Sequence, residues 1–311
     1  MSQKGDNPKR RAGSLRRRGA LTGFLFLLPL LLGLMVFRFY GFGYNIYLSF
    51  TKAGAFGKPK YIGLKNYQQL MDDEQLRVAL ANTFKYCLYI VPCVLVVAII
   101  CALIMQVNIK GQSVWRAIIF LPAVMLPTAA IMLFGWIFQT QYGLVNAMLQ
   151  ALGSKPISWF GSSAGFSFVV TVIVTFLSFS VPAIILYAGL QDIPRDVYEA
   201  AAIDGAGPIR RFFFITLPLL TPTLFFVVLT TTISTLKLFD VPYILLPPEQ
   251  PAAGKYGMTA VYYYYRLAFL DSGKRGYASA VSLILFIAIF AVSLIMFAFQ
   301  RKLVNYGEDY S

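Results

Sequence analysis

The chain has 311 residues, of which 58% are hydrophobic and only 13% are charged, and its formal net charge is +14. An ordinary soluble domain carries about 25% charged residues, so the composition excludes that class. Several nearly uncharged runs are long enough, at about 18 residues or more, to cross a bilayer as helices. The short alternation of barrel strands is not visible. The sequence therefore predicts an all-α integral membrane protein.

The basic residues gather just before the first apolar run. They are Lys4, Lys9, Arg10, Arg11, Arg16, Arg17 and Arg18. Lys and Arg clustered beside a span set its orientation during insertion, with the basic side in the cytoplasm. We therefore interpret the charge as a topology signal, expect no nucleic-acid partner, and predict a basic cytoplasmic tail over residues 1–18. The first apolar run is too long for a signal peptide and should remain attached as a span.

We predict six membrane-spanning helices within one transmembrane domain, residues 19–303. They are Ala20–Phe42, Thr83–Met105, Ala117–Phe138, Phe166–Leu190, Leu217–Leu236 and Ala278–Phe299. Because six is even, both ends of the chain should face the cytoplasm, including a short tail over residues 304–311.

Three longer connections are expected on the outer side. Leu48–Asn82 holds four lysines and an acidic group, Asp72 to Glu74, and Gln139–Gly165 contains Asn146 and Trp159. Asp240–Tyr277 contains a proline-rich stretch and a run of four tyrosines.

A polar cytoplasmic loop, residues 191–222, separates the fourth and fifth spans. Its central part reads YEAAAIDGAGPIRRFFFITLPLLTP from Tyr198 to Pro222. The alanines form a surface with almost no side chain, Gly205 can end a short helix, and Pro208 can begin another. The two later prolines should bend the chain into the fifth span. One interpretation is a docking helix; the other is an amphipathic surface helix in which alanine serves helix propensity alone.

Polar residues near the outer ends of two spans are candidates for the solute pathway. Lys237 and Asp240 are three residues apart, which on a helix places them on one face. They either line a polar cavity, with Phe239 or Tyr243 stacking on the solute, or form an ion pair that fixes the bundle. A second candidate pair, one turn apart on the second span, is Asn82 and Tyr86.

The sequence offers no catalytic or metal site. It contains no histidine, and its three cysteines have no metal-binding spacing. The phosphate-binding pattern G-x-x-x-x-G-K-[ST] is absent as well, so we expect no ATP hydrolysis by this chain.

The order Glu199-Ala200-Ala201, three residues, Gly205, nine residues, Ile215, one residue, Leu217-Pro218 resembles the EAA loop of ABC importer permeases. The resemblance implies the type I importer permease fold with a cytoplasmic coupling helix that docks on an ATPase subunit. ATP and Mg would then be bound by the ATPase partners, and this chain would hold no cofactor. The docking residues implied are Tyr198, Glu199, Ala200, Ala201, Asp204, Gly205 and Ala206.

Weaker motifs in matching order resemble the carbohydrate-uptake branch of that family. They are Gly63-Leu64-Lys65-Asn66-Tyr67, Trp115-Arg116-Ala117, Leu236-Lys237-Leu238-Phe239-Asp240 and Gly276-Tyr277-Ala278-Ser279-Ala280. The resemblance implies a second homologous permease subunit, two ATPase subunits, an external solute-binding protein and a sugar or oligosaccharide as solute. One departure is Leu246-Pro247-Pro248, where the family often has a Gly-Gly-Pro turn.

Two alternatives remain open from the sequence. A permease of the same family could carry a solute other than a sugar, because motifs flanking the spans do not define a ligand. A secondary transporter or channel working alone would need inverted repeats or carboxylates within the spans, and neither is apparent.

Overall fold

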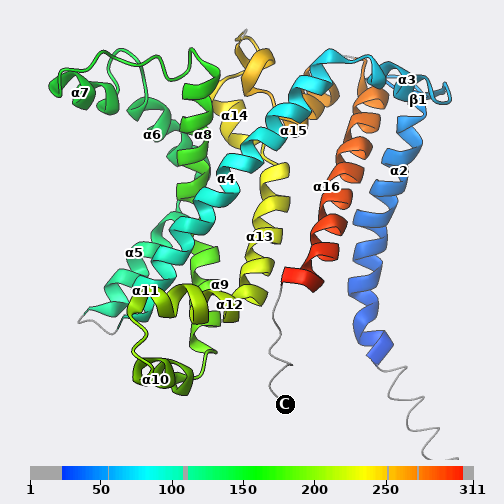
Figure 1. Ribbon diagram of the computed structural model, residues 1–311. Coiled ribbons are helices and arrows are strands. Elements are labelled where there is room, and N and C mark those ends of the chain that lie inside the picture. The colour runs from blue at the N-terminus through cyan, green and yellow to red at the C-terminus, as the bar shows by residue number, and fades with distance from the viewer. Residues whose placement is uncertain (1–22, 55, 108–110, 251, 272, 304–311) are drawn as a thin grey trace, which may run out of the picture.

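The computed structural model describes residues 23–54, 56–107, 111–250, 252–271 and 273–303, which are mostly helical (Figure 1). The tails predicted at 1–18 and 304–311 lie outside these residues. One short antiparallel strand pair occurs in the described part, with Thr51 opposite Tyr61 and Lys52 opposite Lys60. In chain order the elements are η1 (Met35–Phe39), α2 (Tyr40–Ser49), β1 (Thr51–Lys52), β2 (Lys60–Tyr61), α3 (Lys65–Met71), α4 (Glu74–Gln106), α5 (Gln112–Val124), α6 (Pro127–Ile137), α7 (Leu144–Ala151), α8 (Ser163–Ser178), α9 (Ser180–Gln191), α10 (Arg195–Ile203), α11 (Pro208–Arg211), η2 (Phe212–Thr216), α12 (Leu217–Leu219), α13 (Thr221–Leu236), α14 (Asp240–Leu245), η3 (Ala253–Gly257), α15 (Ala260–Tyr265), η4 (Arg266–Leu270) and α16 (Arg275–Leu303).

Four helical segments in the described part are long and apolar enough to cross a membrane. They are Gly23–Ser49, Glu74–Gln106, Thr221–Leu245 and Arg275–Gln300. Two further pairs, α5 with α6 and α8 with α9, qualify only if each bent pair counts as one span, which gives four to six spans in all. The start of the first helix and the end of α16 lie at the same end of the bundle, where α10 also lies (Figure 1).

Prolines explain why two of the expected spans are broken. The stretch expected as one helix, Ala117–Phe138, bends by 94° between α5 and α6, where Pro127 forces the preceding residue into an extended conformation. The stretch expected at Phe166–Leu190 bends by 52° between α8 and α9. There Pro182 has no N–H to donate to the carbonyl four residues earlier, that of Ser178.

Helix α4 is the centre of the bundle and packs against α8, α9, α13 and α15. Its Ala98 and Ala102, one turn apart, are completely buried where α9 approaches most extensively. Small side chains let helix backbones approach closely, which is a principal source of helix association in lipid. By contrast, most large apolar side chains of the first helix are exposed, and its α2 part packs chiefly on α16.

Candidate coupling surface and solute pathway

Helix α10 is a short polar helix at one end of the bundle and contains the EAA stretch (Figure 1). It ends in a Schellman motif: the N–H of Ala206 donates to the carbonyl of Ala201 at 2.9 Å, and that of Gly205 donates to Ala202 at 3.1 Å. The motif requires a left-handed residue, and Gly205 has φ of 76°. The glycine expected to end this helix therefore does so.

The two sides of α10 differ in their surroundings. Ala201 is buried and Tyr198 is half-buried, and Tyr198 packs against the apolar cluster formed by α4, α9 and α13. The other side projects away from the bundle, and Ile203 is 87% exposed. Exposed positions of the predicted docking set are Glu199, Ala200, Asp204 and Gly205, while Ala206 is half-buried. The exposed side of α10 and its C-terminal turn therefore presents small residues, two carboxylates and the apolar side chain of Ile203.

The segment after α10 connects it to the fifth span through a wide helical turn. In η2 the N–H of Leu217 donates to the carbonyl of Phe212, five residues back, and Pro218 follows directly. The hydroxyl of Tyr198 lies 3.0 Å from that of Thr216, the last residue of η2. Pro222 has no N–H for the carbonyl of Pro218, and the Thr221 hydroxyl donates to that carbonyl at 2.7 Å instead.

Helix α13 ends at Leu236, just before Lys237, and a new helix begins at Asp240. Lys237 follows the last residue of α13, Phe239 has irregular backbone angles, and Asp240 begins α14. The shared helix face expected for Lys237 and Asp240 is therefore wrong, because the helix breaks between them. Both side chains are exposed, and no ion pair of 4 Å or less joins these two described residues. The ion-pair alternative consequently has no support in this structure.

Aromatic rings gather beside this break. The rings of Phe239 and Tyr243 stack with centroids 5.0 Å apart, and Tyr265 lies 4.9 Å from Phe239. Tyr262 meets Tyr243 edge-on at 5.3 Å. Phe239, Tyr243 and Tyr265 are only half-buried, so part of the cluster remains open to a ligand. Half-exposed aromatic faces beside hydroxyl and charged groups can bind the apolar faces of sugar rings.

Asn82 and Tyr86 do not face an open pathway within this chain. Asn82 is 8% exposed and donates to the carbonyl of Met258 at 3.0 Å, while Tyr86 is 1% exposed and donates to that of Tyr256 at 2.6 Å. Both side chains therefore hold the segment around η3 against α4. This corrects their expected role, because their polar atoms are already used inside the subunit.

A second polar cluster, centred on Asp73, was not singled out by the sequence patterns. Asp73 caps α4 by accepting from the N–H of Leu76 at 3.0 Å, and the hydroxyls of Tyr263 and Tyr277 donate to its other oxygen at 2.6 and 2.5 Å. Burial alone raises the pKa of Asp73, but these hydrogen bonds outweigh it and lower the pKa below its usual value. Burial, and then the hydrogen bond to Asp73, raise the pKa of Tyr263, so its hydroxyl remains a donor.

These features define a multi-pass helical membrane protein with a polar helix exposed at one end of the bundle. The model of the family described as the binding-protein-dependent transport system inner membrane component matches residues 86–305, and the chain belongs to this family. Its relatives include sugar transport permeases, so it is an ABC transporter permease of the carbohydrate-uptake kind. Such permeases are the non-catalytic membrane subunits of the transporter. No group of three or more metal-ligating side chains occurs among the described residues.

Three relatives and one solved structure illustrate the relationship. The chain is 31% identical to the probable ABC transporter permease protein YesP of Bacillus subtilis, with 98% of each chain covered. It is 29% identical to the trehalose/maltose transport system permease protein MalF of Thermococcus litoralis, covering 90% of this chain and 94% of the relative. It is 32% identical to the sulfoquinovosyl glycerol transport system permease protein SmoG of Agrobacterium fabrum, covering 92% and 91%.

The fold is shared with a solved importer. A chain of the bacterial alginate ABC transporter, crystallised in complex with an alginate pentasaccharide-bound periplasmic protein, superposes with a TM-score of 0.79. The two chains are 21% identical, and the match covers 93% of this chain and 96% of the other. The type I importer permease fold expected from the EAA loop is thereby confirmed.

Proposed function

We propose that this chain forms half of the translocation pathway of a binding-protein-dependent ABC importer for a sugar or oligosaccharide. The other half would be a second homologous permease subunit, and an external solute-binding protein would deliver the solute. The names of the relatives, which include trehalose/maltose and lactose permeases, support a carbohydrate as the solute class. The observation that carries the mechanism is an EAA helix that is exposed on one side and anchored to the bundle on the other.

The proposed topology has six spans, with both bent helix pairs crossing the membrane and both termini in the cytoplasm. The basic residues before the first helix and the position of α10 at the same end support this orientation. Residues 19–303 would form the single transmembrane permease domain, with a coupling loop at 191–222. The membrane would be the bacterial or archaeal cell membrane.

Helix α10 is the proposed coupling helix. Its exposed small residues would lie in a groove of an ATPase subunit, with Glu199 and Asp204 at the edge of the contact. Two ATPase subunits would bind ATP and Mg, one below each permease chain, and this chain would need no cofactor. Closure of the ATPase pair would move α10, and the contact of Tyr198 with Thr216 would carry that motion to the fifth span.

The proposed solute pathway runs past the break after α13. Lys237 and Asp240 would hydrogen-bond solute hydroxyls, while Phe239 and Tyr243 would stack on a sugar ring. A phosphorylated polyol is the second candidate solute, because a sn-glycerol-3-phosphate permease of Yersinia pestis is 28% identical. In that case the ammonium of Lys237 would bind the phosphate, and loss of its charge would reduce uptake far more than it would for a sugar.

The experiment begins with a mild-detergent purification of the tagged chain from its native membrane, followed by identification of the retained proteins. We expect an ATPase and a second permease, with the ATPase lost in Glu199→Lys but retained in Glu249→Lys, a charge reversal on an outer loop. The purified assembly in proteoliposomes is then supplied with candidate solutes and ATP. Recovery of the chain alone, with solute uptake that needs no ATP, would contradict the proposal.

A further inference from the structure

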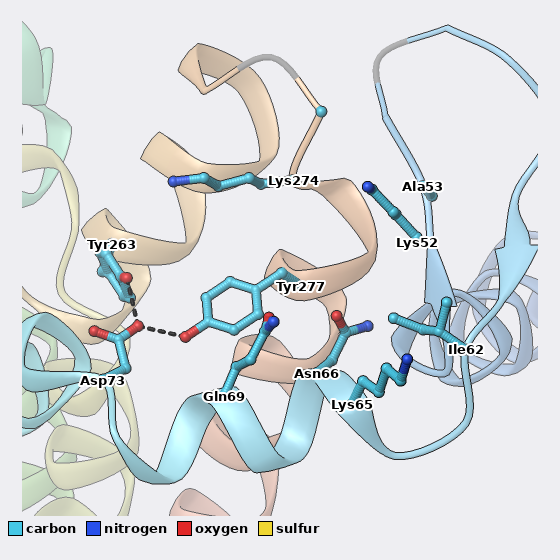
Figure 2. Close-up of a pocket in the computed structure, with 11 residues that line it drawn as sticks. Lys52, Ala53, Ile62, Lys65, Asn66, Gln69, Asp73, Tyr263, Lys274 and Tyr277 are labelled. Atoms are coloured by element: carbon cyan, nitrogen blue, oxygen red, sulfur yellow. Dashed lines mark hydrogen bonds between the residues drawn. The ribbon is translucent and has the colours of Figure 1, made fainter.

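A polar pocket of about 530 Å³ is lined by side chains at the end of the bundle opposite α10, where Figure 1 shows β1 and α3 beyond the ends of α2 and α16. It is formed by segments that are distant in sequence: β1, α3, the start of α4, α15 and the start of α16. Figure 2 shows Asp73, Tyr263 and the Tyr277 hydroxyl at one end of the pocket, with Lys52 and Lys65 at the other. The solute pathway proposed above uses none of these residues.

The charges that line the pocket are mostly positive and are only partly balanced. Lys274 has an acidic partner, Asp271, with a distance of 3.4 Å between the charged atoms. The side chains of Lys52 and Lys65 are exposed and form no ion pair or hydrogen bond within the described part of the chain. Asp73 is the one acidic residue among the described lining residues, and its carboxylate is already occupied by two tyrosines. Two ammonium groups therefore remain available.

The strand pair beside the pocket adds to this excess of positive charge. Lys60 lies directly opposite Lys52 in the register of β1 and β2. Like charges placed opposite each other destabilise a strand pair. Lysines on an outer loop also oppose the usual cytoplasmic bias of basic residues. The four lysines from Lys52 to Lys65, end residues included, therefore repel one another, and an acidic partner would offset that repulsion.

The floor of the pocket is held rigidly. Asp73 joins α4 to α15 and α16 through its two tyrosine partners, and Gln75 donates to the carbonyl of Gly254 at 2.8 Å. The N–H of Gly276 donates to the carbonyl of Ala53, at 3.2 Å, and so joins the start of α16 to the β1 segment. A preorganised surface loses little entropy on binding, and this one is connected directly to the central helix α4.

We propose that this pocket is a docking point for acidic side chains on the external solute-binding protein. Carboxylates of that protein would pair with Lys52 and Lys65, and Lys274 would complete the basic rim. Long, exposed lysines on a rigid floor suit the steering and orientation of a large charged partner. The inference rests on the proposed function, since it requires a binding-protein-dependent importer with this face outside.

The test uses the whole transporter in nanodiscs and the solute-binding protein that stimulates its ATPase activity. We test the single charge reversals Lys52→Glu and Lys65→Glu and the double variant that combines these two. The control is Lys155→Glu, at an exposed outer lysine away from the pocket. We expect about tenfold weaker binding for the double variant at low salt, with the difference shrinking at about 0.5 M salt. The ATPase activity of the double variant at saturating binding protein should equal that of the wild type. The affinity of Lys155→Glu for the binding protein should be unchanged.

Unchanged affinity in the double variant would overturn the docking role. An altered KM for free solute, or a defect that appears only in nanodiscs containing anionic lipid, with binding-protein affinity intact, would also overturn it. These outcomes would assign the lysines to solute or to lipid headgroups. If no solute-binding protein stimulates the wild-type transporter, the proposed function itself fails, and that result is visible before any variant is made.

Discussion

The hydroxyl of Tyr198 lies 3.0 Å from the hydroxyl of Thr216, so helix α10 is joined to the π turn η2 that leads into α12 and α13. Among the described residues it is the only side-chain hydrogen bond that α10 makes. The same tyrosine ring packs on the cluster of α4, α9 and α13. One polar contact and one aromatic ring therefore join α10 to the rest of the bundle, and these are the contacts through which the proposed coupling would act.

Replacing Tyr198 by Phe should weaken coupling more than folding. The ring and its packing remain, and the loss of one hydrogen bond costs about 1 kcal/mol. We expect ATPase activity to persist in the assembled transporter while less solute moves for each ATP hydrolysed. The measurement is the ratio of uptake to hydrolysis in proteoliposomes. Tyr142→Phe, at an exposed position outside α10, is the control, and an unchanged ratio in Tyr198→Phe would exclude the coupling role.

Gly205 should tolerate substitution poorly because of its backbone. At φ of 76° a residue with a Cβ is strained by about 1–2 kcal/mol, although no neighbouring atom blocks the space. We expect Gly205→Ala to lower uptake, Gly205→Asp to abolish it, and membrane insertion to survive both. Gly205→Asn should be milder, since Asn tolerates this conformation. Gly207→Ala, at a φ of −68° with equally open space, should behave as wild type.

The helical membrane fold followed from composition, but the breaks within it did not. Uncharged length predicts a span whether or not the helix is straight, so Ala117–Phe138 and Phe166–Leu190 were expected as single rods. Pro127 and Pro182 were visible in the sequence, but prolines also occur within membrane helices that remain continuous. The difference between a kink and a 94° turn depends on how neighbouring helices pack, which a local pattern does not contain.

Helix α10 was the most predictable part of the candidate site because its signal is local. Glu199 to Gly205 is one short segment whose helix and C-cap follow from residue types and spacing. The roles of Asn82 and Asp73 were harder to predict, because their hydrogen-bond partners lie about 180 residues or more later in the chain. A polar residue near a span end looks the same whether it binds a solute or a distant carbonyl. Only the tertiary structure distinguishes these roles.

Asp73 should stabilise the junction of α4, α15 and α16 in a pH-dependent way. The folded state lowers the pKa of its carboxyl, so it favours the ionised form. The contribution is complete above the ordinary pKa of about 4 and is lost as the pH falls through the lower folded value. Asp73→Asn should destabilise the protein at pH 7 by about 1–3 kcal/mol, because two tyrosine donors lose a charged acceptor.

Thermal unfolding in detergent between pH 3 and pH 7.5 measures this effect. The difference in unfolding temperature between wild type and Asp73→Asn should be constant near neutral pH and should become smaller at the acidic end of the range. Asp72→Asn is the matched control, because that neighbouring residue is exposed and none of the hydrogen bonds described here involves its carboxylate. A difference that stays the same down to pH 3 would show that the ionised carboxylate is not the source of stability.

Asn82 and Asp240 should separate structural from pathway roles. Asn82→Ala leaves the carbonyl of Met258 without its buried donor, so we expect a lower unfolding temperature and an unchanged KM for solute among transporters that remain assembled. Asp240→Asn, at an exposed position, should leave the unfolding temperature unchanged and raise the KM. Uptake kinetics and thermal unfolding of both variants give the comparison. The reverse pattern would move Asn82 back into the pathway.

The aromatic cluster at the end of the fifth span tests the solute class. If a sugar ring stacks on Phe239 or Tyr243, replacing either ring by Leu keeps apolar volume but removes the flat face, which is worth about 1 kcal/mol or more. We expect the KM for a sugar to rise about fivefold to tenfold, while Tyr264→Leu, outside the ring contacts described above, should have little effect.

A phosphorylated polyol has no ring to stack, so its KM should change little in Phe239→Leu or Tyr243→Leu and strongly in Lys237→Gln. Uptake of both solute types by the same set of variants therefore decides between the two candidate solutes, because each predicts a different residue as the sensitive one.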